Sequence, residues 1–447
     1  MTRSPFFIQP ALALLASLCA ASAAAENPLD ADNQKLAEKV AQLGSKPEAA
    51  LPLFTLFDRW DETTPQKTLA LLDQLAGDKR VAPSLRVLIE TLRAEAKARL
   101  GDLDALGERF DQLGYVGRWR VIGPFDNEGK SGFDKETPPE QKRMEAPDLQ
   151  ASYPGRERPV GWRQHPDIVR RGYVSFGAIM RPRENVCALA ETFVYSERAR
   201  PLLLLLGSGG ASKVYWNGRE VLRDEAYRMP SSDRSSVMVA ARKGSNRVLV
   251  KVCVANGAFG FALRLGEADG SPAKALRVET TSKDALEITE RSSPHLPKAP
   301  LAPLAALEQA AKRAPDNAGT LADLARFLRA TGGDDPAERR AKQLAAHAAE
   351  LAPTLENLRL ASELAEERSE VMRFAQRAKE LFPNEPGALL LEAKVLANGP
   401  RPEDALPLLA RVPETDLDWA TAQVVRAQVL RELDLPAMAR SAIEQAL

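Results

Sequence analysis

The period of the apolar residues changes twice along this chain, and this change constrains the fold more than any other feature. Over residues 30–113 apolar residues recur at three- and four-residue spacing, as in QKLAEKVAQLG. From about residue 115 they alternate with polar residues, and after residue 303 the helical spacing returns. Spacing near 3.6 residues indicates helices, and alternation indicates strands. The sequence therefore predicts helical segments at 30–113 and 304–447 around a β domain at 115–278.

The N-terminus resembles an export signal. A basic residue precedes the apolar run FFIQPALALLASLCAA, and small residues at Ala23 and Ala25 offer a cleavage site before Glu26. The run is short for a membrane span, and polar sequence follows it at once. A bulky leucine before Cys19 fits a lipoprotein signal poorly. We therefore predict a signal peptide over residues 1–25 and an exported mature chain without a membrane span, periplasmic, envelope-associated or secreted.

The overall charge gives no reason to expect nucleic acid or an anionic membrane as partner. Lys+Arg and Asp+Glu are equal, at 61 each. The 3 histidines, His165, His295 and His347, are spread over a loop, a proline-rich stretch and a helical stretch. They are too scattered to form one metal site. The stretch GSGGAS lacks the Lys-Ser/Thr of a phosphate-binding loop. No catalytic residue, metal site or cofactor is predicted, and the chain is expected not to be an enzyme.

Two cysteines remain once the signal is removed. Cys187 and Cys253 can form a disulfide in an exported protein, because that compartment is oxidising. The alternative is that they are two small residues packed in a core, since cysteine is often buried.

Many short alternating segments between residues 115 and 278 predict an antiparallel β-sandwich or jelly roll. In NRVLVKVCV the valines at 248, 250, 252 and 254 share one face, and Leu249, Lys251 and Cys253 share the other. Residues 126–165 are rich in proline, glycine and charge and are expected to form a long, loosely structured excursion.

The stretch KVYWNGREV predicts a tight hairpin. Asn217-Gly218 suits a type I′ turn, in which both central residues need positive φ. A two-residue loop would set three cross-strand pairs: Trp216 with Arg219, Tyr215 with Glu220, and Val214 with Val221. Val214 and Trp216 then share a face that packs on the core, so the motif is structural first.

Residues 279–303 are expected to be a linker. Prolines recur there at every third position, from Pro294 to Pro303. That is the period of polyproline II, so the linker is expected to act as a semi-rigid spacer.

The C-terminal segment resembles tetratricopeptide (TPR) repeats. Pro315, Pro353 and Pro383 each end a helical stretch, and their average spacing is close to the roughly 34 residues of this repeat. Small residues at Ala341 and Ala348 stand where the repeat places them. The aromatic landmarks of the repeat are missing and the spacing varies, so a generic solenoid of helical hairpins stays open.

The β segment resembles the galactose-binding-like jelly roll, an accessory module of many carbohydrate-active and cell-surface proteins. The resemblance covers about residues 115–275 and rests on LLLLLGSGGASKVYWNGREVL and KGSNRVLVKVCV. Both are scaffold stretches. With helical repeats on either side, the chain resembles the non-catalytic front part of large exported bacterial TPR proteins, some of which carry a transglutaminase-like domain.

The resemblance implies carbohydrate binding, and aromatic faces beside polar groups near strand ends are the residues to expect for it. The candidates are Tyr215, Trp216, Tyr227, Arg228, Asn256 and Phe259.

The leading expectation is an exported, non-catalytic scaffold whose repeats bind a protein or peptide partner. Two alternatives stay open: a module that targets the protein to a polysaccharide, and an accessory fragment of an envelope enzyme of the transglutaminase or protease kind whose catalytic domain is absent.

Overall fold

The computed structural model describes residues 27–44, 46–103, 110, 112–166, 172–281, 296–299, 302–331 and 335–446. The predicted signal peptide, His295 and most of the proline-rich linker lie outside the described residues.

The chain begins with four helices that pack on one another. They are α1 (Pro28–Leu43), α2 (Ala50–Asp58), α3 (Pro65–Gly77) and α4 (Pro83–Arg99). Asn27 caps α1 by accepting a hydrogen bond from the backbone N–H of Leu29, and proline stands in the first turn of α1, α3 and α4, where it costs no hydrogen bond. Leu53, Leu72 and Ile89 form part of their common core.

Two antiparallel sheets follow. The larger has the order β4–β1–β6–β11–β8–β9, with β13 also paired to β6, and the smaller has the order β10–β7–β12–β5. The strands of the larger sheet are β1 (Arg120–Asp126), β4 (Arg163–Gln164), β6 (Val186–Ser196), β8 (Ala211–Trp216), β9 (Arg219–Asp224), β11 (Gly244–Val254) and β13 (Leu276–Glu279). Those of the smaller are β5 (Tyr173–Ser175), β7 (Arg200–Gly209), β10 (Ser235–Ala241) and β12 (Gly260–Gly266).

The two sheets enclose one core, and strand β11 shows how its alternation is used. Val248, Val250, Val252 and Val254 point into this core, together with leucines of β7 and β12. Leu249 and Cys253 lie in a second core on the outer face of the larger sheet. Both faces of β11 are therefore buried.

The hairpin forms at Asn217-Gly218, with φ of 49° and 81°. Trp216 pairs with Arg219 as expected, but Val214 faces Leu222 and not Val221, because a bulge shifts the register between Val214 and Tyr215. The inserted residue adds local twist at this end of the strand.

The excursion over 126–165 is not loosely structured, which corrects the expectation from its composition. It contains helix α6 (Pro138–Gln141) and the short hairpin of β2 (Tyr153–Pro154) and β3 (Pro159–Val160). Phe133 and Val160 are buried against the outer face of the larger sheet. The excursion thus covers a sheet face that would otherwise be exposed.

After the sandwich the chain returns to helices, and each consecutive pair is in contact. They are α8 (Pro303–Arg313), α9 (Ala318–Ala330), α10 (Asp335–Leu351), α11 (Leu355–Leu364), α12 (Arg368–Leu381), α13 (Pro386–Ala397), α14 (Leu406–Leu409), α15 (Trp419–Glu432) and α16 (Pro436–Ala446). Ala345, Ala348 and Ala378 are fully buried, and such small side chains let neighbouring helices approach closely.

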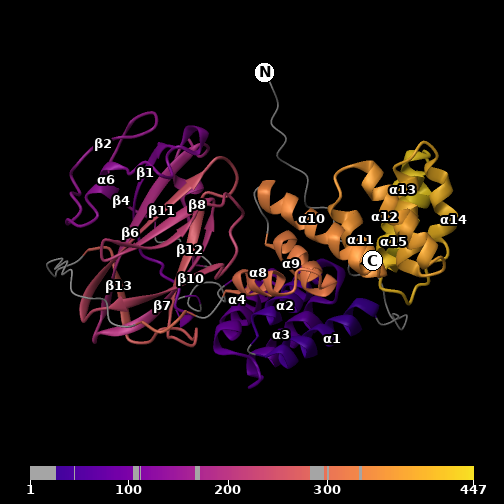
Figure 1. The fold of residues 1–447 in the computed structure, drawn as a ribbon, viewed down its shortest axis with the longest axis horizontal. Coiled ribbons are helices and arrows are strands. Elements are labelled where there is room, and N and C mark those ends of the chain that lie inside the picture. The colour runs from indigo at the N-terminus through magenta and orange to yellow at the C-terminus, as the bar shows by residue number, and fades with distance from the viewer. Residues whose placement is uncertain are drawn as a thin grey trace.

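The two helical segments form one body although the sandwich separates them in sequence. Ala50 of α2 shares a core with residues of α8 and α9, and helices α2 and α9 lie side by side (Figure 1). We call this continuous stack, α1–α4 followed by α8–α16, the helical array. The sandwich stands at one end of it (Figure 1).

Candidate functional site

The six residues proposed for sugar binding do not form one surface. Tyr215, Trp216 and Phe259 are 2%, 4% and 3% exposed. Trp216 and Phe259 lie in the core between the sheets, whereas Tyr215 lies in the core beneath the excursion. The Trp216 Nε1–H donates to the carbonyl oxygen of Ala240 at 2.9 Å. These three rings therefore offer no face on which a sugar could stack.

The other three candidates are more accessible, and two of them, Tyr227 and Arg228, are consecutive in the chain. Tyr227 is half-buried beside the excursion, where its hydroxyl contacts the side chain of Asn127. Arg228 pairs with Asp224 of β9 at 2.8 Å. Asn256 is exposed in the turn after β11.

Cys187 and Cys253 form a disulfide with an S–S distance of 2.03 Å. They stand directly opposite each other on β6 and β11, and both are fully buried under the excursion.

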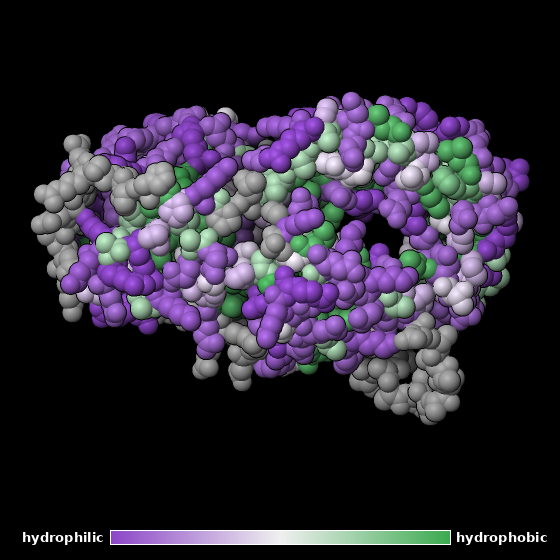
Figure 2. Space-filling model, turned by 60° about the horizontal axis from the view of Figure 1, so that its bottom comes forward, coloured by the Kyte–Doolittle hydropathy of each residue, from purple (hydrophilic) through white to green (hydrophobic). Residues whose placement is uncertain are grey.

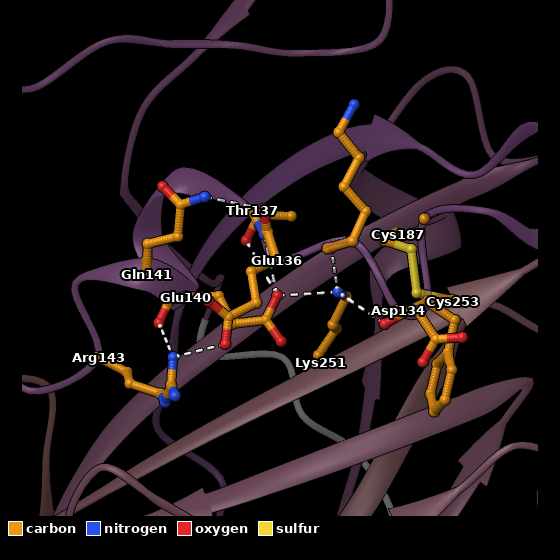
Figure 3. Close-up of polar contacts among 12 residues, drawn as sticks. Asp134, Glu136, Thr137, Glu140, Gln141, Arg143, Cys187, Lys251 and Cys253 are labelled. Carbon is orange, nitrogen blue, oxygen red and sulfur yellow. Dashed lines mark hydrogen bonds and ion pairs between the residues drawn. A yellow bond between two sulfur atoms is a disulfide. The ribbon is translucent and has the colours of Figure 1, made fainter.

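Next to the disulfide lies a fully buried ion pair, Lys251 of β11 with Glu140 of α6 (Figure 3). The Lys251 Nζ donates to a Glu140 carboxylate oxygen at 2.8 Å and to the carbonyl oxygens of Phe133 and Lys135 at 3.1 and 2.9 Å. Three acceptors match the three protons of an ammonium group. Burial lowers the pKa of Lys251, and the charge of Glu140 opposes this effect. Because every donor is used within the protein, the pair fastens the excursion to the sheet and leaves no group for a reactant.

A second buried pair repeats this arrangement nearby. Arg247 of β11 donates to Glu191 of β6 and to the carbonyl oxygens of Arg143 and Glu145 in the excursion. Burial raises the pKa of Glu191, and the guanidinium of Arg247 opposes this effect.

A pocket of about 320 Å³ opens where three parts of the chain meet. We call it the junction pocket. Helices α2 and α4 supply one wall, and the outer face of β7 supplies a second. The start of α8 and Phe327 of α9 form a third. Its apolar lining includes Phe54, Leu85, Leu88, Leu203, Leu205, Leu304 and Phe327.

Residues 231–234 and Ser236, just before and within β10, form the polar side of the junction pocket. There Asp233 is held by Arg264, whose Nε donates to both carboxylate oxygens at 2.8 Å. The Arg234 Nη2 donates to the carbonyl oxygens of Met229 and Thr331, at 2.6 and 2.9 Å. The second of these bonds ties the sandwich to the end of α9.

Arginine–carboxylate pairs join helices of the array that are not consecutive in sequence. The pairs are Arg326 with Glu356, Arg329 with Glu363, and Arg359 with Asp418. The last is bidentate, with both distances 2.7 Å. We call this set of six residues the paired-charge face. It runs from α9 through α11 to the start of α15, and its Arg329 and Glu356 are well exposed.

Burial raises the pKa of Asp323 on α9, while the charges of Arg326 and of Lys39 from α1 oppose this effect. In the helical half of the molecule, a hollow opens with hydrophobic and hydrophilic residues at its border (Figure 2). The helical half of the molecule therefore has a recessed surface (Figure 2).

In comparisons with known proteins, this chain matches solved structures alone. No protein-family model and no curated protein matches the chain. Among solved structures, the crystal structure of MamA is similar over 32% of this chain and 85% of its own, at 15% identity and a TM-score of 0.27. Two beta-glucosidase structures from Kluyveromyces marxianus are similar over 33% and 52% of this chain and 16% and 22% of their own. Their identities are 12% and 11%, and their TM-scores 0.22 and 0.19.

Within the described ranges, no three His, Cys, Asp or Glu side chains gather as a metal ion would require. Nor does any helix in that part of the chain combine the length and apolar character needed to cross a bilayer.

Sequence reasoning did not find Glu140 or the junction pocket. A lysine in the middle of the apolar run VLVKVCV does signal a buried partner, since a lysine inside a core needs one. The stretch around Glu140 looks like ordinary polar loop, so it does not identify that partner. The pocket is built from six stretches that lie apart in the sequence, and no local pattern marks it.

Proposed function

We propose that this protein is an exported, non-catalytic interaction scaffold whose helical array binds a protein or peptide partner along the paired-charge face. The observation that carries the proposal is the row of arginine–carboxylate pairs that link α9 to α11 and α11 to the start of α15, of which the two between α9 and α11 are partly open to solvent. Charged groups that already face each other can exchange partners with a peptide at modest cost, because exposed pairs are weak. The resemblance of the segment to TPR repeats agrees with this use.

The proposal of export is supported by the signal-like N-terminus together with the Cys187–Cys253 bond. Disulfides persist in oxidising compartments and are rare in the cytosol.

The absence of catalysis is proposed from how the buried charges are used. Lys251, Glu140 and Arg247 are closed off by partners in the protein itself. None of them faces a space that a substrate could enter.

The sandwich, with its jelly-roll resemblance, is proposed to hold the array rather than to bind carbohydrate. The burial of Tyr215, Trp216 and Phe259 favours this role. Retention of the full chain on a polysaccharide, lost in an Asn256→Ala or Tyr227→Ala variant, would reverse this assignment.

The proposal is tested by site-specific photo-cross-linking in cells that export the full chain. A photoreactive residue at Glu356 should give a discrete adduct, and the same residue at Asn256 should not. Arg329→Glu should abolish the Glu356 adduct, whereas Arg377→Glu on α12, outside the paired-charge face, should leave it. Equal adducts from both positions, or an adduct indifferent to Arg329→Glu, would contradict the proposal.

A further inference from the structure

The junction pocket is too large to be an ordinary packing defect. Protein interiors are close-packed, and few of their voids exceed the size of a water molecule. A pocket of about 320 Å³ falls within the range of small-molecule sites. Such sites occur preferentially where domains meet, and this one lies where the sandwich joins both helical segments.

The deep walls of the pocket are apolar. Phe54 and Phe327 pack edge to face at one side, and Leu203 and Leu205 project from the outer face of β7 at the other. Leu88 of α4 and Leu304 of α8 complete this lining. Water in contact with such apolar walls is unfavourable. An apolar group that displaces this water contributes favourable transfer free energy to binding.

The lining of the pocket carries net positive charge. Arg234 lies on its polar side, and Lys46, exposed in the connection between α1 and α2, also lines it. Among the described lining residues Asp233 is the acidic one, and the buried guanidinium of Arg264 balances its charge. The bonds from Arg234 to two carbonyl oxygens leave its charge in place. Serine hydroxyls at Ser231, Ser232 and Ser236 add hydrogen-bonding groups.

We propose that the junction pocket binds a small amphiphile with an aliphatic body and one carboxylate, the body against the leucine and phenylalanine walls and the carboxylate toward Lys46 and Arg234. A ligand placed there touches the sandwich and both helical segments at once. It therefore stabilises their relative placement, which is a role distinct from partner binding at the paired-charge face.

The experiment is calorimetric titration of the full mature chain with hexanoate, octanoate and decanoate, each below its micelle-forming concentration. Affinity should rise about fourfold for each added methylene until the pocket is full. Octanoate should bind at least about tenfold more tightly than octylamine, because the positive lining disfavours an ammonium group.

Two variants test the placement. Leu88→Trp fills the pocket and should weaken octanoate binding at least about tenfold. Lys46→Glu should weaken octanoate but not octanol, and Lys35→Glu on α1, another exposed lysine, should change neither. Because Lys46 is exposed, its variant is expected to fold even if Leu88→Trp does not. Equal binding of octanoate and octylamine, no dependence on chain length, or octanoate binding unchanged in Lys46→Glu would overturn the proposal.

Discussion

Phe54 of α2 and Phe327 of α9 pack edge to face, with ring centroids 6.0 Å apart and an interplanar angle of 66°. The whole sandwich lies between these residues in sequence. Their contact closes the helical array at the point where the chain returns from the β domain, and it also forms part of the junction pocket wall. The two rings therefore join the two helical segments.

Replacing Phe327 by alanine should lower the free energy of unfolding by about 3–5 kcal/mol, the usual effect of removing a buried phenylalanine ring. Urea denaturation followed by circular dichroism measures it. Phe382→Ala, in a half-buried position at the end of α12, is the matched control and should lose less. Equal losses of unfolding free energy in the two variants would mean that the contact between the two helical segments adds no stability beyond that of an ordinary half-buried ring.

Breaking the Lys251–Glu140 pair should be costly because one charge would stay buried alone. Lys251→Met or Glu140→Gln should each lower the free energy of unfolding by about 3–5 kcal/mol. The double variant should lose clearly less than the two single losses added together, since neither charge then remains. Arg377→Met, which removes an exposed pair with Glu380, should change stability by less than about 0.5 kcal/mol. Additive losses from the two buried positions would show that the pair is not coupled.

Asp30 should make the free energy of unfolding decrease at acidic pH. Burial would raise the pKa of this carboxyl, but hydrogen bonds from the Thr64 backbone and hydroxyl, and the ammonium of Lys67, bring the net pKa below 3.8. A carboxyl with a lowered folded-state pKa stabilises the fold above its unfolded pKa, and this contribution is lost as the pH falls through the folded value.

The urea midpoint should therefore fall less between pH 7 and pH 3 in Asp30→Asn than in the unchanged chain. Asp316→Asn, at an exposed position, should keep the original dependence. An identical acid dependence in Asp30→Asn would show that this carboxyl does not contribute.

Thiol titration of residues 26–447, which exclude Cys19, should find no free cysteine after denaturation without reduction, because Cys187 and Cys253 are joined. The double change to alanine should lower the free energy of unfolding by about 2–5 kcal/mol. Two titratable thiols per chain in this unreduced material would contradict the pairing.

The alternation of β11 and the turn at Asn217-Gly218 could be predicted because both are local: side chains alternate at a period of two, and only certain residues accept positive φ. The partner of Val214 could not, since a bulge adds one residue to the pairing without a sequence mark.

The candidate site was harder to predict because it, too, depends on contacts that the local sequence does not determine. Tyr215 stands among the candidates for sugar binding because the strand pattern does not reveal that the excursion covers the outer face of the larger sheet. Long-range packing also decides that α2 meets α9, and no periodicity in either helix announces it.

The most direct test of the account is a distance measurement between spin labels across the helical array. In a chain that starts at Glu26 and so lacks Cys19, labels at Lys35→Cys on α1 and Arg377→Cys on α12 occupy exposed sites, and Cys187 and Cys253 are held in their disulfide. If the two helical segments form one body, pulsed electron resonance should give a single narrow distance distribution, broadened by Phe327→Ala. A broad or multiple distribution in the unaltered background would show that the segments move independently, and the continuous array would have to be abandoned.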